Sequence, residues 1–377
     1  MKVIADDKIP FLKGALEPFA DVEYYPGKSI SKELITDADA LLIRTRTHCN
    51  RELLENTNVK FIASATIGFD HIDTDYCDAN KIVWTNAPGC NSSSVQQYIA
   101  SVLITLAKRH GFDLRDRTLG VIGVGNVGKK VVKLAEYLGM RVLLNDPPRQ
   151  RSEVPCQFIS LDGIFREADI ITFHVPLNRE GQDKTYHLAD EQFFGKLLPG
   201  TILINSSRGE VVNNSALKEA LKSGQVAGAV LDVWENEPEI DTELLKMVDI
   251  ATPHIAGYSA DGKANGTTMS IRALSSYFNL GIDDWEPEEV LQPGSSSFQI
   301  DCYGKENGQV IGEAILKTYN VLADDKRLRD SVNTFEQQRG NYPLRREFPA
   351  YEIELKNSDQ RLEHTLRKLG FKIKTIK

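Results

Sequence analysis

The sequence predicts an α/β protein in which one parallel-sheet domain is inserted in another and is followed by a small α/β module. Three observations predict this class. Short apolar runs alternate with helix-period segments over about the first 280 residues, as in parallel sheets covered by helices. Two long helical segments, 93–108 and about 261–280, mark the two crossings between domains. An acidic stretch rich in Pro, Gly and Ser, DDWEPEEVLQPGSSS, then precedes further alternating elements.

Length, composition and charge narrow the class of protein. A chain of 377 residues is too long for one ordinary core, so two or three domains are expected. A net charge of −8 disfavours nucleic acid and anionic membranes as main partners. The sequence shows no signal peptide and no apolar run of membrane length, and its five cysteines lack C-x-x-C pairs. We therefore expect a cytoplasmic protein with reduced thiols and without a metal site.

The first ninety residues read as a sheet with polar loops at its edge. Five strands are predicted, at Val3–Ala5, Val22–Tyr25, Ala40–Ile43, Phe61–Ala65 and Ile82–Thr85, with a helix over Phe11–Phe19. The loops RTRTHCN and ATIGFDHID follow two of these strands, at the sheet edge where α/β proteins bind ligands. Arg44, Thr45, Arg46 and Thr66 are therefore candidates for binding an anionic substrate, although ordinary loop polarity explains them equally well.

The stretch from Thr118 to Asp146 carries the most specific ligand motif. An apolar strand leads into Gly123, Gly125 and Gly128 in G-x-G-x-x-G spacing, followed by an amphipathic helix and a second strand. These glycines allow the turn, the approach of a pyrophosphate and the packing of helix on strand. Asp146 stands where a carboxylate accepts hydrogen bonds from the adenosine ribose. The context predicts a Rossmann domain that prefers NAD, since the carboxylate would repel the 2′-phosphate of NADP, a preference that the nearby Arg149 would soften.

Polar residues recur at the carboxyl ends of the following strands, predicted at 170–173, 202–205, 227–231 and 250–251. Oxidation of an alcohol by NAD needs a base for the proton, and histidine suits this task. A carboxylate fixes the imidazole tautomer, and an arginine binds a substrate carboxylate through two hydrogen bonds. His254, Glu237 and Arg208 are the candidates. Each alone reads as a structural histidine or a loop ion pair, but the three together favour a reactive site.

Residues beyond 281 form a third region. Helices are predicted over Val310–Leu322, Leu328–Gln337 and Asp359–Leu369, the last capped by Ser358, and strands over Tyr351–Leu355 and Phe371–Ile376. Without a nucleotide motif, this module is expected to form a homodimer, with a regulatory ligand site as the alternative. The predicted domains are 1–92 with 257–280 for the substrate, 93–256 for the dinucleotide and 281–377 for dimerisation.

Five ordered motifs, GVIGVGNVG, HVPLN, NSSRGEVV, LDVWENEP and TPHIAGYS, resemble the D-isomer-specific 2-hydroxyacid dehydrogenases up to about residue 280. The resemblance implies a flavodoxin-like substrate domain around the Rossmann domain. It implies that Arg208 binds the substrate carboxylate, that Glu237 pairs with the histidine and that His254 is the general acid/base. The implied NAD contacts are Gly123, Gly125, Asn126, Val127, Gly128, Asp146, Val175, Ser206, Ser207, Arg208, Asp232 and Gly257.

A finer resemblance, to one branch of that family with a small phosphorylated 2-hydroxy acid as substrate, covers essentially the whole chain. It rests on RTRTHCN, ATIGFDHID, PGCNSSSV, HIAGYSADGK and QQRGNYPLRREFP. It implies that Thr45, Thr66 and Tyr258 bind substrate and that the C-terminal module forms the homodimer. We assign the phosphate to Arg44 and Arg46, with Arg345 or Arg346 of the partner subunit as further candidates.

Two alternatives stay open. The chain could act on another D-2-hydroxy acid, such as 3-phosphoglycerate, glycerate or lactate, because the three reactive residues do not contact the part of the substrate that differs among these acids. It could also be an NAD-sensing binding protein, like the transcriptional corepressors built on this fold. A compact C-terminal module in place of a polar disordered tail favours an enzyme.

Overall fold

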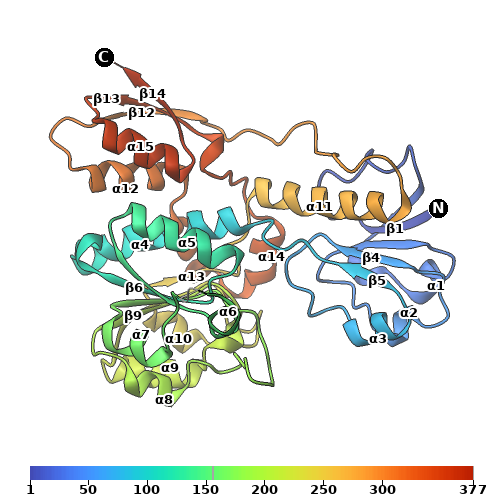
Figure 1. Cartoon of the computed structure of the whole chain (residues 1–377), viewed down its shortest axis with the longest axis horizontal. Coiled ribbons are helices and arrows are strands. Elements are labelled where there is room, and N and C mark those ends of the chain that lie inside the picture. The colour runs from blue at the N-terminus through green and yellow to red at the C-terminus, as the bar shows by residue number, and fades with distance from the viewer. Residues whose placement is uncertain (155–156, 377) are drawn as a thin grey trace. The chain divides into compact units, whose positions relative to one another are not determined.

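The computed structural model describes residues 1–154 and 157–376, which form two compact units. One unit comprises Met1–Asn91 and Ser259–Leu291, and the other comprises Ser92–Tyr258 and Gln292–Lys377 (Figure 1). In the described part of the chain, no helix combines the length and apolarity needed to cross a membrane. Four cysteines are free and buried, whereas the prediction for Cys156 lies outside the described residues.

The first unit is built on a five-stranded parallel sheet in the order β2-β1-β3-β4-β5, the flavodoxin-like order. Its strands are β1 (Lys2–Asp6), β2 (Asp21–Tyr25), β3 (Ala40–Ile43), β4 (Phe61–Ser64) and β5 (Val83–Thr85). Its helices are α1 (Lys32–Ile35), α2 (Arg51–Leu54), α3 (Thr74–Ala79) and α11 (Ala260–Phe278), with a 3-10 turn η1 (Gly27–Ser29). Helix α11 buries Ile271 and Leu274 against the sheet, so the segment after residue 258 completes this unit.

The predicted helix over Phe11–Phe19 is wrong, because this segment forms a series of turns. Phe11 and Gly14 have φ angles of 63° and 87°, in the left-handed region that a right-handed helix excludes. Leu12 and Leu16 are nevertheless buried. Their helix-like spacing therefore reflects two apolar anchors of a turn segment.

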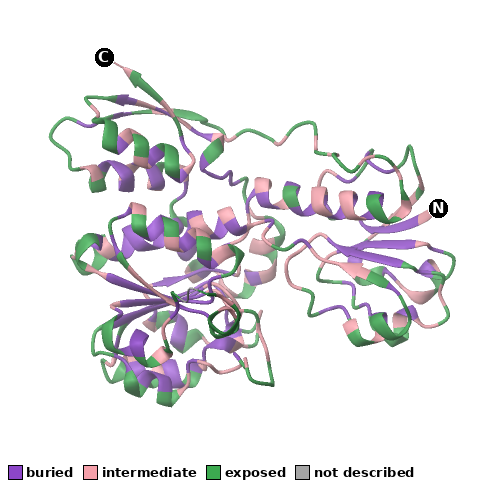
Figure 2. Cartoon of the chain, in the orientation of Figure 1, coloured by how far each residue is buried: buried purple, intermediate pink, exposed green. Residues whose placement is uncertain are grey.

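The second unit contains a six-stranded parallel sheet in the order β11-β10-β9-β8-β6-β7. Its strands are β6 (Thr118–Ile122), β7 (Arg141–Asn145), β8 (Ile170–Phe173), β9 (Thr201–Asn205), β10 (Val226–Leu231) and β11 (Ile250–Ala251). Its helices and 3-10 turns are α4 (Ser92–His110), η2 (Leu114–Asp116), α5 (Asn126–Tyr137), α6 (Pro147–Ser152), α7 (Leu161–Glu167), α8 (Glu191–Lys196), η3 (Gly209–Val211), α9 (Asn214–Lys222) and α10 (Thr242–Met247). Helices α4 and α5 cover one face, α7 to α10 cover the other, and the strands between them are buried except for most of the edge strand β7 (Figures 1 and 2). The chain direction across the sheet reverses between β6 and β8, which is where such sheets bind ligands.

The C-terminal module adds a three-stranded parallel sheet with helices. Its strands are β12 (Ser297–Asp301), β13 (Glu352–Lys356) and β14 (Lys372–Ile376), and its helical elements are α12 (Asn307–Thr318), α13 (Val321–Asp330), η4 (Val332–Thr334), α14 (Phe335–Gly340), η5 (Phe348–Ala350) and α15 (Gln360–Leu369). The helix predicted over Val310–Leu322 is broken, because Asn320 caps a new helix through the amide of Leu322. Asp359, rather than Ser358, caps α15.

The C-terminal module shares its core with the six-stranded sheet. Helix α12 lies against α4, where the absence of a side chain on Gly312 leaves room for the side chain of Ile104. Helix α13 covers the edge strand β11: Asp325 accepts a hydrogen bond from the Ala251 amide at 2.7 Å, and Arg329 donates to the Val248 carbonyl at 2.9 Å. The module is thus packed on the sheet that carries the glycine motif.

Candidate active site

The glycine motif forms the turn from β6 into α5. Gly123 has a φ of 87°, and a side chain there would lie 2.5 Å from the His174 carbonyl. A side chain on Gly128 would lie 2.1 Å from the Gly123 carbonyl, whereas one on Gly125 would meet open space. Gly123 and Gly128 therefore build the turn, and Gly125 leaves room over the N-terminus of the twelve-residue helix that Asn126 and Val127 begin.

Acidic and hydroxyl groups beside the turn fit a dinucleotide. Asp146 accepts a hydrogen bond from the Val124 amide at 2.8 Å, which fixes its carboxylate beside the glycines. Arg149 is held by two hydrogen bonds to Glu153, so its charge is already compensated. The hydroxyl of Ser206, at the end of β9, is buried without a hydrogen-bond partner. A buried unpaired hydroxyl is costly, and a ligand amide or hydroxyl would satisfy it.

Arg208 is positioned by the backbone around it. The side-chain amide of Asn205 donates to the Arg208 carbonyl at 2.9 Å, and its oxygen accepts from the Ser207 amide at 3.1 Å. Gly209 then passes so close to the next loop that a side chain there would lie 2.0 Å from the Trp234 carbonyl. Only glycine fits at this crossing, and Arg208 is thereby held next to the loop that carries Glu237.

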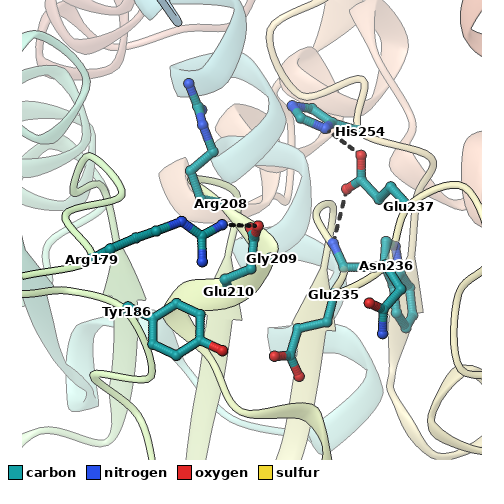
Figure 3. Close-up of a pocket in the computed structure, with 10 residues that line it drawn as sticks. Arg179, Tyr186, Arg208, Gly209, Glu210, Glu235, Asn236, Glu237 and His254 are labelled. Carbon is teal, nitrogen blue, oxygen red and sulfur yellow. Dashed lines mark hydrogen bonds and ion pairs between the residues drawn. The ribbon is translucent and has the colours of Figure 1, made fainter. Parts of the chain in front are cut away.

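His254 and Glu237 form a hydrogen-bonded pair, with 2.7 Å between the imidazole Nδ1 and Oε2 (Figure 3). The other oxygen of Glu237 accepts the Trp234 amide at 2.9 Å. Burial acts to raise the pKa of Glu237, but the attraction and hydrogen bond of His254 and the Trp234 N–H outweigh it, so the pKa lies below its ordinary value. The carboxylate is therefore ionised and fixes the imidazole with Nε2 as its second ring nitrogen.

The backbone of the catalytic loop, residues 252–258, is held by Asp232. This carboxylate is 1% exposed and accepts hydrogen bonds from the amides of Ile255 and Ala256 and from the Thr252 hydroxyl. His254 has a φ of 56°, an uncommon conformation for a residue with a side chain. Asp232 thus stabilises a strained loop, in addition to its predicted contact with the cofactor.

The three predicted reactive residues line one cavity of about 380 Å³. Figure 3 shows Arg208 and the His254–Glu237 pair in the upper part of the view, with Arg179 and Tyr186 below them. The remaining lining residues are Arg179, Tyr186, Gly209, Glu210, Trp234, Glu235 and Asn236. Sequence reasoning did not select Arg179, Tyr186 or Glu210. Arg179 and Tyr186 belong to the loop after β8, to which the rule about strand ends already points.

The other predicted cofactor and substrate residues lie in loops of both units. Val175 follows β8 and contacts the Gly123 turn, and Gly257 and Tyr258 end the catalytic loop. In the first unit, Arg44, Thr45 and Arg46 follow β3, and Thr66 follows β4. Thr45 and Arg46 are exposed, while the Thr66 hydroxyl lies 2.7 Å from that of Ser64.

The structure corrects the candidate role of Arg345. Its side chain is 5% exposed and donates to the carbonyls of Ser94 and Ala256 at 3.0 and 2.6 Å. A guanidinium buried and hydrogen-bonded within its own chain does not reach the substrate of a partner subunit. Arg346 is likewise buried. Arg44 and Arg46 remain the predicted phosphate ligands.

Comparison with known proteins agrees with this geometry. Residues 93–256 match the model described as "D-isomer specific 2-hydroxyacid dehydrogenase, NAD binding domain", and residues 291–370 match a domain of unknown function. An erythronate-4-phosphate dehydrogenase of Bacteroides thetaiotaomicron is 55% identical over 94% of this chain and 99% of its own length, and one of Klebsiella pneumoniae is 42% identical over 98% of both. The crystal structure of D-lactate dehydrogenase from Aquifex aeolicus, complexed with NAD and lactic acid, superposes with a TM-score of 0.61 at 26% identity, covering 74% of this chain and 96% of that one.

The second unit therefore contains an NAD-binding domain, as its glycine turn and the open space above Gly125 require. The two erythronate-4-phosphate dehydrogenases match 94% and 98% of this chain, which includes most of the C-terminal module. The D-lactate dehydrogenase structure matches only 74% of it. The chain belongs to the erythronate-4-phosphate dehydrogenases, within the D-isomer-specific 2-hydroxyacid dehydrogenase family.

Proposed function

We propose that the chain oxidises 4-phospho-D-erythronate at its C2 hydroxyl to (R)-3-hydroxy-2-oxo-4-phosphooxybutanoate, a step of pyridoxal 5′-phosphate biosynthesis. The observation that carries the reaction is the His254–Glu237 pair, 2.7 Å apart, in one cavity with Arg208. The substrate comes from the relatives named erythronate-4-phosphate dehydrogenase.

Arg208 binds the C1 carboxylate in this mechanism. Its planar guanidinium offers two parallel N–H donors, and its charge polarises the adjacent C2 centre. One of its Nη atoms donates to the Ser207 carbonyl at 2.8 Å, which limits the directions that the side chain can take. The substrate is thus oriented before the proton moves.

Neutral His254 removes the proton of the C2 hydroxyl through Nε2. Glu237 stabilises the resulting imidazolium through the hydrogen bond to Nδ1, and stays ionised because its pKa lies below the ordinary value. NAD, when bound, supplies the acceptor for the hydride that leaves C2. Gly123, Gly125, Gly128, Asp146 and Ser206 would hold it, and the compensated charge of Arg149 supports NAD rather than NADP.

Substrate contacts outside the cavity are part of the same proposal. Thr45, Thr66 and Tyr258 bind the substrate, and Arg44 and Arg46 bind its phosphate, which suits their place in loops at the carboxyl end of β3 and β4. Replacing Arg46 by alanine should raise KM for the phosphorylated acid at least tenfold and leave the affinity for NAD unchanged. An unchanged KM would remove Arg46 from phosphate binding.

We also propose that the chain is a cytoplasmic homodimer formed through its C-terminal module. Strand β14 is an edge strand, and such an edge is either protected by charged side chains, as Lys372 and Lys374 would do, or covered by a partner. Sedimentation of the full chain measures its mass directly. A monomer at micromolar concentration would contradict this part of the proposal.

Turnover with a panel of acids tests the function. Reduction of NAD is followed with 4-phospho-D-erythronate, 3-phosphoglycerate, glycerate and D-lactate under identical conditions. The expected result is a kcat/KM for 4-phospho-D-erythronate at least a hundredfold above the others. Preference for another acid would overturn the proposed substrate, and NAD binding without turnover of any acid would favour an NAD sensor.

A further inference from the structure

The C-terminal module reaches the catalytic loop through one segment. We call residues 335–347 the clamp segment, which comprises α14 and the extended chain after it. Arg345 donates to the carbonyls of Ile255 and Ala256 at 3.4 and 2.6 Å, directly after His254. The ring of Tyr342 contacts that of Tyr258 edge to face, with 5.7 Å between centroids. The loop that carries His254 is therefore packed against the clamp segment on one side.

Arg339 of the clamp segment lies against Tyr258, the last residue of the catalytic loop. Its guanidinium lies over the Tyr258 ring, 5.9 Å from the centroid, and one Nη donates to Glu336 at 2.8 Å. Its Nε is buried without a hydrogen-bond partner, and its side chain is only 20% exposed. A buried N–H without a partner costs stability, and the Nε of Arg345 shares this state, so what distinguishes Arg339 is the cation that it places on the Tyr258 ring. Its positive charge also acts on Glu237.

We propose that Arg339 is a positioning residue for the oxidation: α14 holds its guanidinium on the Tyr258 ring, and its charge acts on the His254–Glu237 pair from the C-terminal module. This role rests on the proposed function of that pair as the base and its partner. It would make the C-terminal module part of the catalytic site as well as an assembly element. The cation would keep the carboxylate charged while disfavouring premature protonation of the imidazole.

The charges around the pair set the direction of the effect. Arg208 and Arg179 line the same cavity as cations, and Glu210 and Glu235 line it as anions. Glu336 is the anion paired with Arg339. Attraction by Arg339 is one of the causes that lower the pKa of Glu237, after those of His254 and the Trp234 N–H. Removing Arg339 deletes a cation and one ion-pair partner of Glu336, and the loss of positive charge favours a protonated pair.

The test is the pH profile of kcat/KM in three full-length variants. Because the neutral imidazole takes the substrate proton, Arg339→Gln should move the acid limb of the profile to higher pH by about half a unit or more. Arg339→Lys keeps the charge and should restore the limb toward the wild-type position. Arg367→Gln removes an exposed cation from the same module and is the matched control, for which no shift is expected.

A fourth variant covers the case in which Arg339→Gln fails to fold. Glu336→Gln leaves the charge of Arg339 uncompensated and should move the acid limb to lower pH, opposite to Arg339→Gln. A limb that stays in place in Arg339→Gln and Glu336→Gln would overturn the proposal, as would equal shifts in the Gln and Lys variants of Arg339. The profiles are measured with whichever acid the wild-type protein oxidises, so a wrong substrate assignment shows in the wild type and not in the comparison of variants.

Discussion

His254 and Glu237 are joined by a 2.7 Å hydrogen bond. In the proposed mechanism the imidazole moves the proton, and the carboxylate fixes its tautomer. His254→Ala should lower kcat by roughly 10²- to 10⁴-fold, the usual contribution of a positioned acid/base. The affinity for NAD, measured by fluorescence titration, should change less than about twofold because the glycine turn is untouched. His364→Ala replaces an exposed histidine and serves as control. A near-normal turnover would remove His254 from its role.

Glu237 allows a prediction about pH. Since its pKa lies below the ordinary 4.5, the carboxylate favours the native state above that value, and this stabilisation is lost as the pH falls through the lowered pKa. Glu237→Gln should therefore lower the free energy of unfolding at pH 7 but less at pH 3, as chemical denaturation at both values would show. It should also lower kcat and move the acid limb of kcat/KM to lower pH, because the imidazolium loses its anion. An unmoved limb would contradict the assigned pairing.

Two glycines in the turn between β6 and α5 have different expected roles, one in folding and one in cofactor binding. A methyl group on Gly128 would overlap the Gly123 carbonyl, whereas one on Gly125 meets no protein atom within 4 Å. Gly128→Ala should lower the free energy of unfolding by about 1–3 kcal/mol or more, the usual cost of overpacking. Gly125→Ala should leave stability within about 0.5 kcal/mol and weaken NAD binding at least tenfold, because the added methyl occupies the approach to the phosphates. Thermal melting and NAD titration of both variants test this contrast, and equal effects would contradict it.

Regular elements with strong local signals were predictable from the sequence. The strands around Gly123 and the three reactive residues follow from apolar runs ending in polar residues, because parallel strands place those ends at one edge. The turns at residues 11–19 were not predictable, because the buried Leu12 and Leu16 are four residues apart, which is also the spacing of one face of a helix. Strand β12 was hidden behind the acidic linker, where Ser297–Asp301 has only two apolar residues.

Contacts between distant segments were beyond the sequence. Arg339 and Arg345 stand in a polar run without periodicity, and only the fold brings them to the catalytic loop. Nothing local distinguishes the buried Arg345 from the exposed Arg367. The cavity residue Arg179 was missed for a similar reason, since long loops give no register from which to place a side chain.

At the scale of the whole molecule, the C-terminal module and the NAD-binding domain are energetically linked. Both contribute to a single apolar core, in which side chains of α12, β13 and α15 lie with those of α4 and α5. Asp325 and Arg329 of α13 also satisfy backbone groups at the edge of the six-stranded sheet. A module used only for assembly would be expected to fold beside the catalytic part rather than within its core. The structure instead predicts that binding and stability depend on it.

Truncation tests this dependence. A chain ending at Leu291 loses the buried apolar side chains of the module, including Val310, Ile315, Ile353 and Leu366, each worth roughly 1.5–3 kcal/mol. The sum of four such losses is comparable to the 5–15 kcal/mol that stabilises a typical domain. The truncated chain should lose cooperative melting and NAD binding, whereas a chain ending at Phe371, which lacks only the mostly exposed β14, should retain both with a lower Tm. A stable chain ending at Leu291 with native NAD affinity would contradict this prediction. It would show that the module is a separable appendage and that the catalytic loop does not need the contacts of the clamp segment.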